Sequence, residues 1–263
     1  LYGIYLNYMQ NHLTITLVQT HLLWENPQAN RTAFQSKIEK LQNTADLIIL
    51  PEMFTTGFTM NAAPFAETMD GETIRWMKTL AQKMNTAITG SIIIKHEDRY
   101  FNRLLFVEPN GAVSHYDKRH TFTLAGEDKV YEKGLQKIII DYRGWKICPQ
   151  ICYDLRFPVW SRNTEGYDFL YYVANWPKPR INAWDTLLQA RAIENMCYCA
   201  GVNRIGIDGY GHEYTGNSAA YNMLGTPIAT AKNEELVTVA LDKEHLKAYR
   251  QKLRFLDDMD RFT

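Results

Sequence analysis

Short apolar segments of strand length alternate with amphipathic helical segments along much of this chain. Residues 13–19 alternate at a period of two, which is typical of a strand, and residues 47–50 form a short apolar run. Phe34 and Ile38 share one helical face between these strands, and residues 74–84 show the same helical spacing. A chain that alternates in this way is expected to build sheets covered by helices.

The middle and the end of the chain contain hairpin signals instead. Asn110 and Gly111 separate the apolar arms 104–107 and 112–116, and both residue types tolerate the positive φ of a tight turn. A later hairpin around Gly225 echoes this one, a hint that the two halves are related by an internal pseudo-symmetry. The pattern predicts an α/β (α+β) fold: a four-layer αββα sandwich of two mixed sheets flanked by helices.

We expect residues 10–263 to form a single domain, because no linker or low-complexity stretch divides them. Residues 1–9 are interpreted as an extension or a cloning remnant, since they lack the charged region and cleavage site of a signal peptide.

Lys plus Arg and Asp plus Glu are equal at 29 each, so no overall basic field would recruit nucleic acid or a membrane. The tail 253–263 could dock on a partner subunit or fold back on its own chain.

The four cysteines are Cys148, Cys152, Cys197 and Cys199. They are too few for a disulfide framework in a chain of this size, and their spacing does not match zinc knuckles. Free thiols in a reducing compartment are the simpler interpretation.

Three reactive side chains each follow an apolar strand. Glu52 comes after a four-residue apolar run and a proline, Lys118 follows a hairpin arm, and Cys152 lies where a strand stops and a short helix can begin. We expect that helix start to favour the thiolate and to offer N–H groups to an oxyanion. Taken singly, each residue also has an ordinary structural interpretation; together they supply a nucleophile, a base and a cationic clamp.

At these residues the chain resembles the nitrilase, or carbon–nitrogen hydrolase, superfamily. The matching motifs, in chain order, are Leu50-Pro51-Glu52-Met53-Phe54, Tyr116-Asp117-Lys118-Arg119-His120, Cys152-Tyr153-Asp154-Leu155-Arg156-Phe157-Pro158, Ala174-Asn175-Trp176-Pro177 and Arg191-Ala192-Ile193-Glu194-Asn195. The resemblance covers residues 13–241. Within the superfamily the chain is most similar to the bacterial ω-amidases, the 2-oxoglutaramate amidase branch, mainly through residues 152–163.

The resemblance implies a homodimer. The free thiols point to the cytoplasm, and we expect a mechanism that needs no metal or organic cofactor. It implies that Glu52 is the general base, Lys118 the cationic stabiliser and Cys152 the nucleophile. Glu127 falls at the place of a second acidic residue, and the backbone N–H of Tyr153 would help to hold the oxyanion. The implied reaction converts 2-oxoglutaramate to 2-oxoglutarate and ammonia through a cysteine thioester.

The substrate-binding residues are less constrained. Arg156 could bind a substrate carboxylate, or it could form a structural ion pair with Asp154. Phe58 and Trp176 could line the pocket, or they could be ordinary core aromatics. The chain departs from the family pattern at Thr121-Phe122-Thr123, which would alter the lip of the pocket, and at Cys148-Pro149-Gln150.

Other functions stay open at this point. Another small amide, a nitrile or an N-carbamoyl compound could be the substrate, because the motifs fix the chemistry better than the pocket. The fold could instead serve protein association without catalysis, although the intact triad argues against that. A redox pair of Cys148 and Cys152 is disfavoured, since three residues separate them where such pairs have two.

Overall fold

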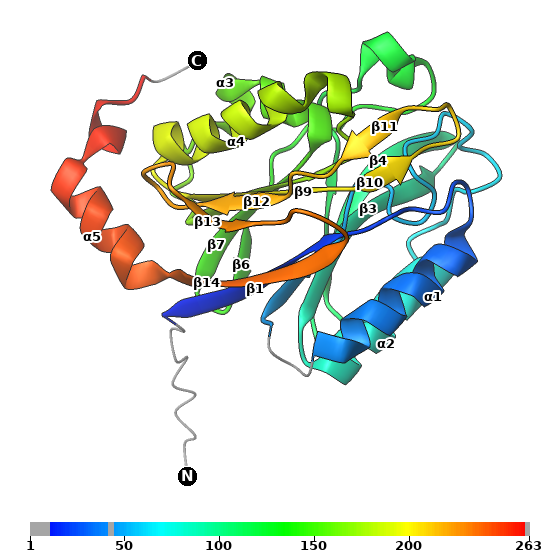
Figure 1. The fold of residues 1–263 in the computed structure, drawn as a ribbon, viewed down its shortest axis with the longest axis horizontal. Coiled ribbons are helices and arrows are strands. Elements are labelled where there is room, and N and C mark those ends of the chain that lie inside the picture. The colour runs from blue at the N-terminus through cyan, green and yellow to red at the C-terminus, as the bar shows by residue number, and fades with distance from the viewer. Residues whose placement is uncertain (1–10, 42–44, 261–263) are drawn as a thin grey trace.

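Two six-stranded mixed sheets lie face to face, and helices cover the outer side of each (Figure 1). This computed structural model describes residues 11–41 and 45–260. The predicted αββα sandwich is confirmed. The extension predicted at residues 1–9 lies outside the described residues.

The first sheet gathers most of the N-terminal half and one C-terminal strand. In spatial order its strands are β14 (Glu235–Asp242), β1 (His12–Gln19), β2 (Leu47–Ile49), β3 (Ala87–His96), β4 (Arg99–Val107) and β5 (Val113–Asp117). The strands β1, β2 and β3 run parallel because α1 (Pro27–Ile38) and α2 (Glu72–Met84) return the chain across the outer face. Those helices bury Phe34, Ile38 and Met77 against this sheet.

The second sheet repeats the arrangement of the first. In spatial order its strands are β13 (Pro227–Thr230), β12 (Ala219–Tyr221), β9 (Tyr198–Asn203), β8 (Phe169–Ala174), β7 (Trp145–Ile151) and β6 (Ile140–Tyr142). Three parallel strands, β7, β8 and β9, again lie between antiparallel neighbours. The hairpins β4–β5 and β12–β13 take equivalent places, in keeping with the pseudo-symmetry that their turns indicated.

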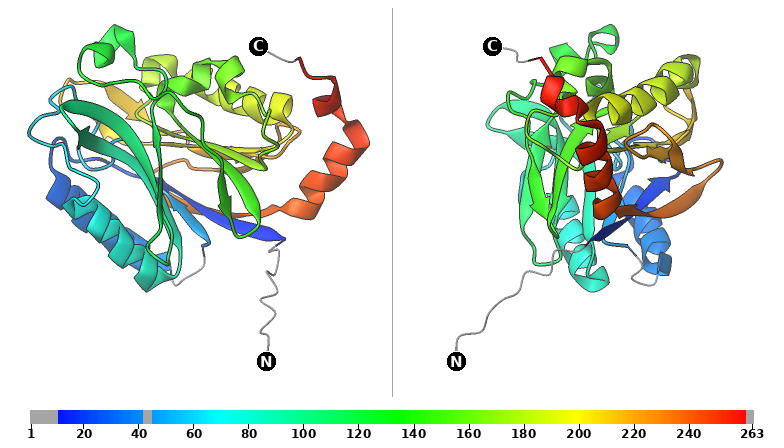
Figure 2. Two further views of the ribbon diagram at one scale, coloured as in Figure 1. Left: turned by 180° about the vertical axis from the view of Figure 1, so that it is seen from behind. Right: turned by 90° about the vertical axis from the view of Figure 1, so that its left-hand side faces the viewer.

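The helices of the second layer lie on the opposite side of the molecule from α1 and α2 (Figure 2). They are α3 (Pro158–Ser161) and α4 (Ile181–Asn195). Between the sheets, Ile15 and Ile49 belong to the same apolar cluster as Ile147 and Val173. The hydroxyls of Thr89 and Tyr171, one from each sheet, lie 2.7 Å apart and link the two layers.

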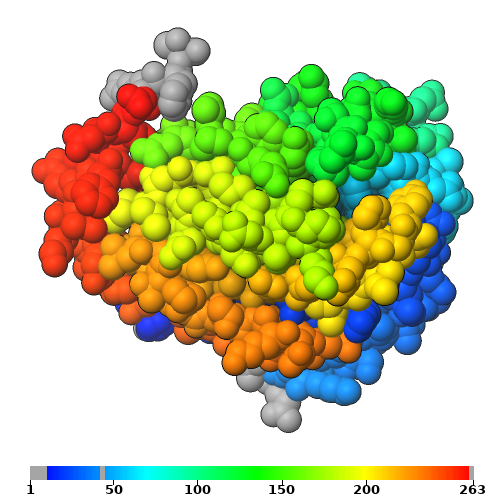
Figure 3. All heavy atoms as spheres, turned by 45° about the horizontal axis from the view of Figure 1, so that its top comes forward, coloured from blue at the N-terminus to red at the C-terminus, as the bar shows by residue number. Residues whose placement is uncertain are grey.

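Several local details differ from the sequence prediction. The apolar run that precedes Gly144 is only partly a strand, because β6 begins at Ile140. A short hairpin that was not predicted joins β10 (Ile205–Ile207) to β11 (Glu213–Thr215). The last helix, α5 (Lys243–Leu253), lies at one end of the surface (Figure 3).

The tail after α5 folds back on its own chain as far as the structure describes it. Leu253 and Leu256 both pack against the large apolar cluster, whereas Phe255 is exposed.

None of the helices in the described residues has the length and apolar character needed to cross a membrane.

Candidate active site

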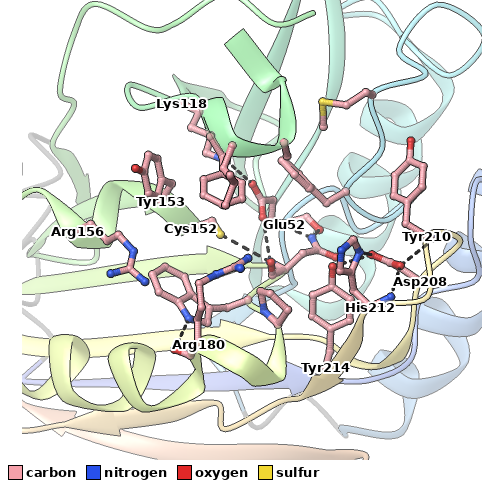
Figure 4. A pocket seen from close by; sticks show the side chains of 18 residues that line it. Glu52, Lys118, Cys152, Tyr153, Arg156, Arg180, Asp208, Tyr210, His212 and Tyr214 are labelled. Atoms are coloured by element: carbon pink, nitrogen blue, oxygen red, sulfur yellow. Dashed lines mark hydrogen bonds and ion pairs between the residues drawn. The ribbon is translucent and has the colours of Figure 1, made fainter. Parts of the chain in front are cut away.

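A cavity of about 460 Å³ opens at the end of the sandwich where Glu52, Lys118 and Cys152 come together (Figure 4). The three side chains come from both sheets: Glu52 follows β2, Lys118 follows β5, and Cys152 follows β7. The residues lining the cavity are Glu52, Phe58, Met60, Lys118, Phe122, Leu124, Ala125, Cys152, Tyr153, Arg156, Asn175, Trp176, Pro177, Arg180, Asp208, Tyr210, His212 and Tyr214. The structure thus brings every predicted site residue except Glu127 to the cavity wall, and Glu127 lies directly behind Lys118.

A buried cluster of two carboxylates and one ammonium lies at and behind the floor of the cavity. Lys118 Nζ donates to Glu52 Oε1 at 2.8 Å and to the two oxygens of Glu127 at 3.0 and 2.9 Å. Relative exposure is 1% for Lys118 and 0% for both carboxylates. Burial opposes the charged ammonium, but the charges of Glu127 and Glu52 outweigh it and raise the pKa of Lys118. Burial also raises the pKa of Glu127, against the pull of Lys118. The cluster keeps a permanent cation at the cavity floor.

Two asparagines that sequence reasoning did not single out orient Glu52. The backbone N–H of Asn175 donates to Glu52 Oε2 at 2.9 Å, and its side-chain amide donates to the Glu52 carbonyl at 2.6 Å. Asn102 Nδ2 donates to Glu52 Oε1 at 2.8 Å. The signals available were the position of Asn175 in a matched motif and a polar Asn102 beside the apolar run of strand β4.

The loop that begins at Lys118 is fixed at both ends. Lys118 N donates to the Asn102 carbonyl at 3.0 Å, and Gly134 N donates to the Lys118 carbonyl at 2.8 Å. A Cβ on Gly134 would lie 2.0 Å from the Asp117 carbonyl oxygen, so only glycine allows this close approach. The Asp117 carboxylate is paired with Arg103 at 2.6 Å. The ammonium is therefore positioned by its backbone as well as by its carboxylate partners.

Cys152 lies at a sharp turn from β7 into a 3₁₀ helix, Cys152–Arg156. Its φ of 43° is in the left-handed region, which is costly for a residue with a side chain and is found at functional sites. Asp154 secures the turn by accepting from Ile151 N at 3.0 Å, from Tyr116 Oη at 2.8 Å and from His120 N at 2.9 Å. The same carboxylate therefore ties the turn of Cys152 to the segment that carries Lys118.

The prediction that the helix start favours the thiolate is wrong. Burial, and then the charge of Glu52, raise the pKa of Cys152 well above its ordinary value, although Lys118 acts in the opposite direction. The helix is a single five-residue 3₁₀ segment, and its dipole is too small to reverse these effects. The thiol is protonated at rest, and its sulfur contacts the Asn175 carbonyl at 3.9 Å. Chemistry at this sulfur needs a base, and Glu52 lies beside it.

The predicted pocket residues line the cavity as expected. The structural ion pair of Arg156 with Asp154 is not formed, because Asp154 accepts from other donors, including His120 Nδ1 at 2.8 Å. The Arg156 guanidinium lies 4.8 Å from the centroid of the Trp176 ring. The Phe58 ring centroid lies 5.0 Å from Lys118 Nζ.

Two further parts of the wall were missed by sequence reasoning. One is Arg180, at the end of the 3₁₀ segment Lys178–Arg180. The other is the β10–β11 hairpin, whose lining residues are Asp208, Tyr210, His212 and Tyr214. Short strands of three residues gave no periodic signal that could have placed this hairpin.

The four cysteines are all unpaired and buried. Burial raises the pKa of Cys148 to about 12. In the described part of the chain, no group of three or more His, Cys, Asp or Glu side chains is arranged to hold a metal ion.

The fold and the cavity define a class: an αββα hydrolase with a buried cysteine beside a carboxylate and an ammonium. Comparison with known proteins gives the family. The carbon–nitrogen hydrolase profile matches residues 14–251, and the chain belongs to this family.

Named relatives span nearly the whole chain. The protein is 46% identical to Omega-amidase YafV of Yersinia enterocolitica, over 95% of this chain and 98% of the relative. It is 31% identical to 2-oxoglutaramate amidase of Bacillus subtilis, over 94% of this chain and 97% of the relative. The crystal structure of a CN-hydrolase superfamily protein from Xanthomonas campestris superposes with a TM-score of 0.94 at 42% identity, covering 97% of this chain and 99% of that one.

Proposed function

We propose that this protein is an ω-amidase that hydrolyses the side-chain amide of a small 2-oxo acid, with 2-oxoglutaramate as substrate. One observation carries the proposal: a buried cysteine lies beside a carboxylate and a buried ammonium at an open cavity. The names of the relatives, ω-amidase and 2-oxoglutaramate amidase, support the choice of substrate.

In the first half of the reaction, Glu52 takes the proton from the Cys152 thiol and the sulfur adds to the amide carbon. The carbonyl π electrons move to oxygen, and this oxyanion is held by Lys118 Nζ and the backbone N–H of Tyr153. Tyr153 is the second residue of its helix, where an N–H has no acceptor within the helix. When the intermediate collapses, the carbon–nitrogen bond breaks and Glu52 returns the proton to the departing ammonia.

In the second half, water attacks the thioester. Glu52 takes a proton from that water, the carbon–sulfur bond breaks, and the proton goes back to the sulfur of Cys152. Glu127 does not line the cavity, but both of its carboxylate oxygens accept from Lys118 Nζ, and these contacts aim the ammonium. Lys118 Nζ and the Tyr153 N–H are fixed donors to the oxyanion. In comparable sites each such donor stabilises the transition state by about 3–4 kcal/mol.

The proposal is tested by ammonia release from 2-oxoglutaramate, glutamine, a nitrile and an N-carbamoyl amino acid. We expect 2-oxoglutaramate to be the preferred substrate. The Cys152→Ala variant should lose at least about a thousandfold in turnover with its circular dichroism spectrum unchanged. Cys148→Ala is the matched control, since it removes a buried thiol of the same strand that does not line the cavity and should retain turnover. Near-normal turnover by Cys152→Ala, or no ammonia from any compound, would contradict the scheme; the second result would favour a non-enzymatic association protein.

We further propose that the protein acts as a cytoplasmic homodimer of single-domain subunits. The apolar cluster shared by the two sheets supports a single domain, and the unpaired thiols support a reducing compartment. Val159 and Phe255, exposed by 63% and 57%, flank a surface hollow beside α3 and support association there. Light scattering of the purified protein gives the number of subunits.

A further inference from the structure

Two arginines at the cavity wall have side chains with no polar partner among the residues that the structure describes. Among the described residues, every arginine other than Arg156 and Arg180 donates a hydrogen bond or forms an ion pair. A guanidinium is charged at any relevant pH and carries five N–H donors in a rigid fork. That the two exceptions share one cavity indicates that their partner is a ligand.

Aromatic rings and one backbone contact hold the two arginines in place. The Arg156 guanidinium lies over the ring of Trp176, whose indole N–H donates to the Arg180 carbonyl at 2.8 Å. The Arg180 guanidinium lies 5.2 Å from the centroid of the Phe122 ring, and Phe122 N donates to Glu127 Oε2 at 2.5 Å. A guanidinium held against a ring face keeps its in-plane N–H groups available for a carboxylate.

The arrangement gives the cavity two different ends. In Figure 4, Arg156 lies on one side of Cys152 and Asp208, Tyr210 and His212 lie on the other, with Arg180 between them. The carboxylate of Asp208 accepts from Tyr214 Oη at 2.8 Å and from backbone N–H groups, and among the described residues it forms no ion pair with either arginine.

We propose that Arg156 and Arg180 form a carboxylate clamp that selects ω-amides with a terminal carboxylate and rejects those with an ammonium beside it. This inference rests on the proposed amidase function and assigns its specificity. In a 2-oxo acid the carbon next to the carboxylate is neutral. In glutamine the same carbon carries an ammonium, which would lie beside two cations with no acidic side chain at that end to offset them.

The test compares two amides of equal chain length, glutaramate and pentanamide, of which only glutaramate has a carboxylate. The readout is the ratio of their kcat/KM values. We expect Arg180→Ala and Arg156→Ala each to lower this ratio by about 10- to 100-fold, mainly through KM for glutaramate. Arg180→Lys keeps the charge but not the fork, and its ratio should lie between those of the wild type and Arg180→Ala. Arg180→Glu should favour the cationic 5-aminopentanamide over glutaramate.

A nearby cation provides the control. Lys178 lies in the same 3₁₀ segment as Arg180, but it pairs with Glu213 at 2.8 Å and does not line the cavity. Lys178→Ala should leave the ratio unchanged. A calorimetric titration with glutarate adds a readout without turnover, and its Kd should rise about 10-fold or more in Arg180→Ala.

The outcomes separate this inference from the proposed function. If the wild-type protein cleaves both amides but neither arginine variant changes the ratio or the glutarate Kd, the clamp is wrong and the amidase function stands. If the wild-type protein releases ammonia from neither amide nor from 2-oxoglutaramate, both proposals fall.

Discussion

Replacing Lys118 by methionine tests the electrostatic account of the cavity floor most directly. The substitution keeps a linear side chain of similar length but removes the only cation that contacts Glu52 and Glu127 among the described residues. Both carboxylates are 0% exposed. Removing one partner of a buried ionic cluster costs about 3–5 kcal/mol. We expect Lys118→Met to lose about that much unfolding free energy at pH 7, and to lose turnover as well.

The loss should depend on pH in a defined direction. Burial and the charge of Glu52 raise the pKa of Glu127 in the folded state, and removing Lys118 takes away the main influence that opposes them, whereas a glutamate in the unfolded chain ionises near pH 4.3. Between these values the folded state binds a proton that the unfolded state does not. The penalty is therefore largest at high pH and shrinks as pH falls, by up to about 1.4 kcal/mol per unit.

The assay is equilibrium denaturation in urea at several pH values from pH 5 to pH 8, with tryptophan fluorescence as the measure of unfolding. The double variant Lys118→Met/Glu127→Gln removes one of the two charges and should recover much of the loss at pH 7. Lys178→Met, which breaks a pair exposed by 54% on both sides, is the control and should change stability by about 0.5 kcal/mol or less. A loss by Lys118→Met that is the same at pH 5 and pH 8, with no recovery in the double variant, would refute the reasoning and indicate a packing defect.

Two further predictions concern a buried thiol and a glycine. Burial raises the pKa of Cys148 to about 12 from an ordinary value of 9.0, so the unfolded chain releases this proton first and stability falls as pH rises through 9. By pH 10 this thiol should cost about 1.4 kcal/mol, and Cys148→Ala should lose correspondingly less between pH 8 and pH 10 in guanidinium titrations; equal losses would exclude the thiol as the cause. Gly134→Ala places a Cβ 2.0 Å from the Asp117 carbonyl oxygen, and we expect about 1–3 kcal/mol of destabilisation with a lower kcat because the Lys118 loop must shift. Unchanged thermal unfolding and kcat in that variant would show that the loop adapts without moving Lys118.

The fold could be predicted from the sequence because its strands have strong local signals. Residues 169–174 are continuously apolar and form β8. The hairpin at Gly111 is encoded by residues that tolerate positive φ, and Gly111 has φ 86°. The β10–β11 hairpin could not be predicted, because three-residue strands carry no periodicity and its position depends on contacts with distant residues such as His21.

The site was predictable to the extent that its residues lie at strand ends. Glu52, Lys118 and Cys152 each follow an apolar strand, and the structure places all three at one cavity. The protonation state of Cys152 was not predictable, because it depends on burial and on a carboxylate one hundred residues earlier in the chain. Arg180 was overlooked for a similar reason. Its assignment as a ligand-binding residue depends on its side chain having no polar partner among the described residues, and only the packed structure reveals that.

The two sheets share one strand arrangement, but equivalent strand ends carry different groups at the site. Glu52 and Asn175 follow β2 and β8, which are the middle parallel strands of their sheets, and they hydrogen-bond to each other across the sandwich. A second carboxylate at position 175 would place two anions in contact. The amide instead donates to Glu52 and leaves it free to accept that proton. Related strand ends thus supply a base on one sheet and the donor that orients it on the other.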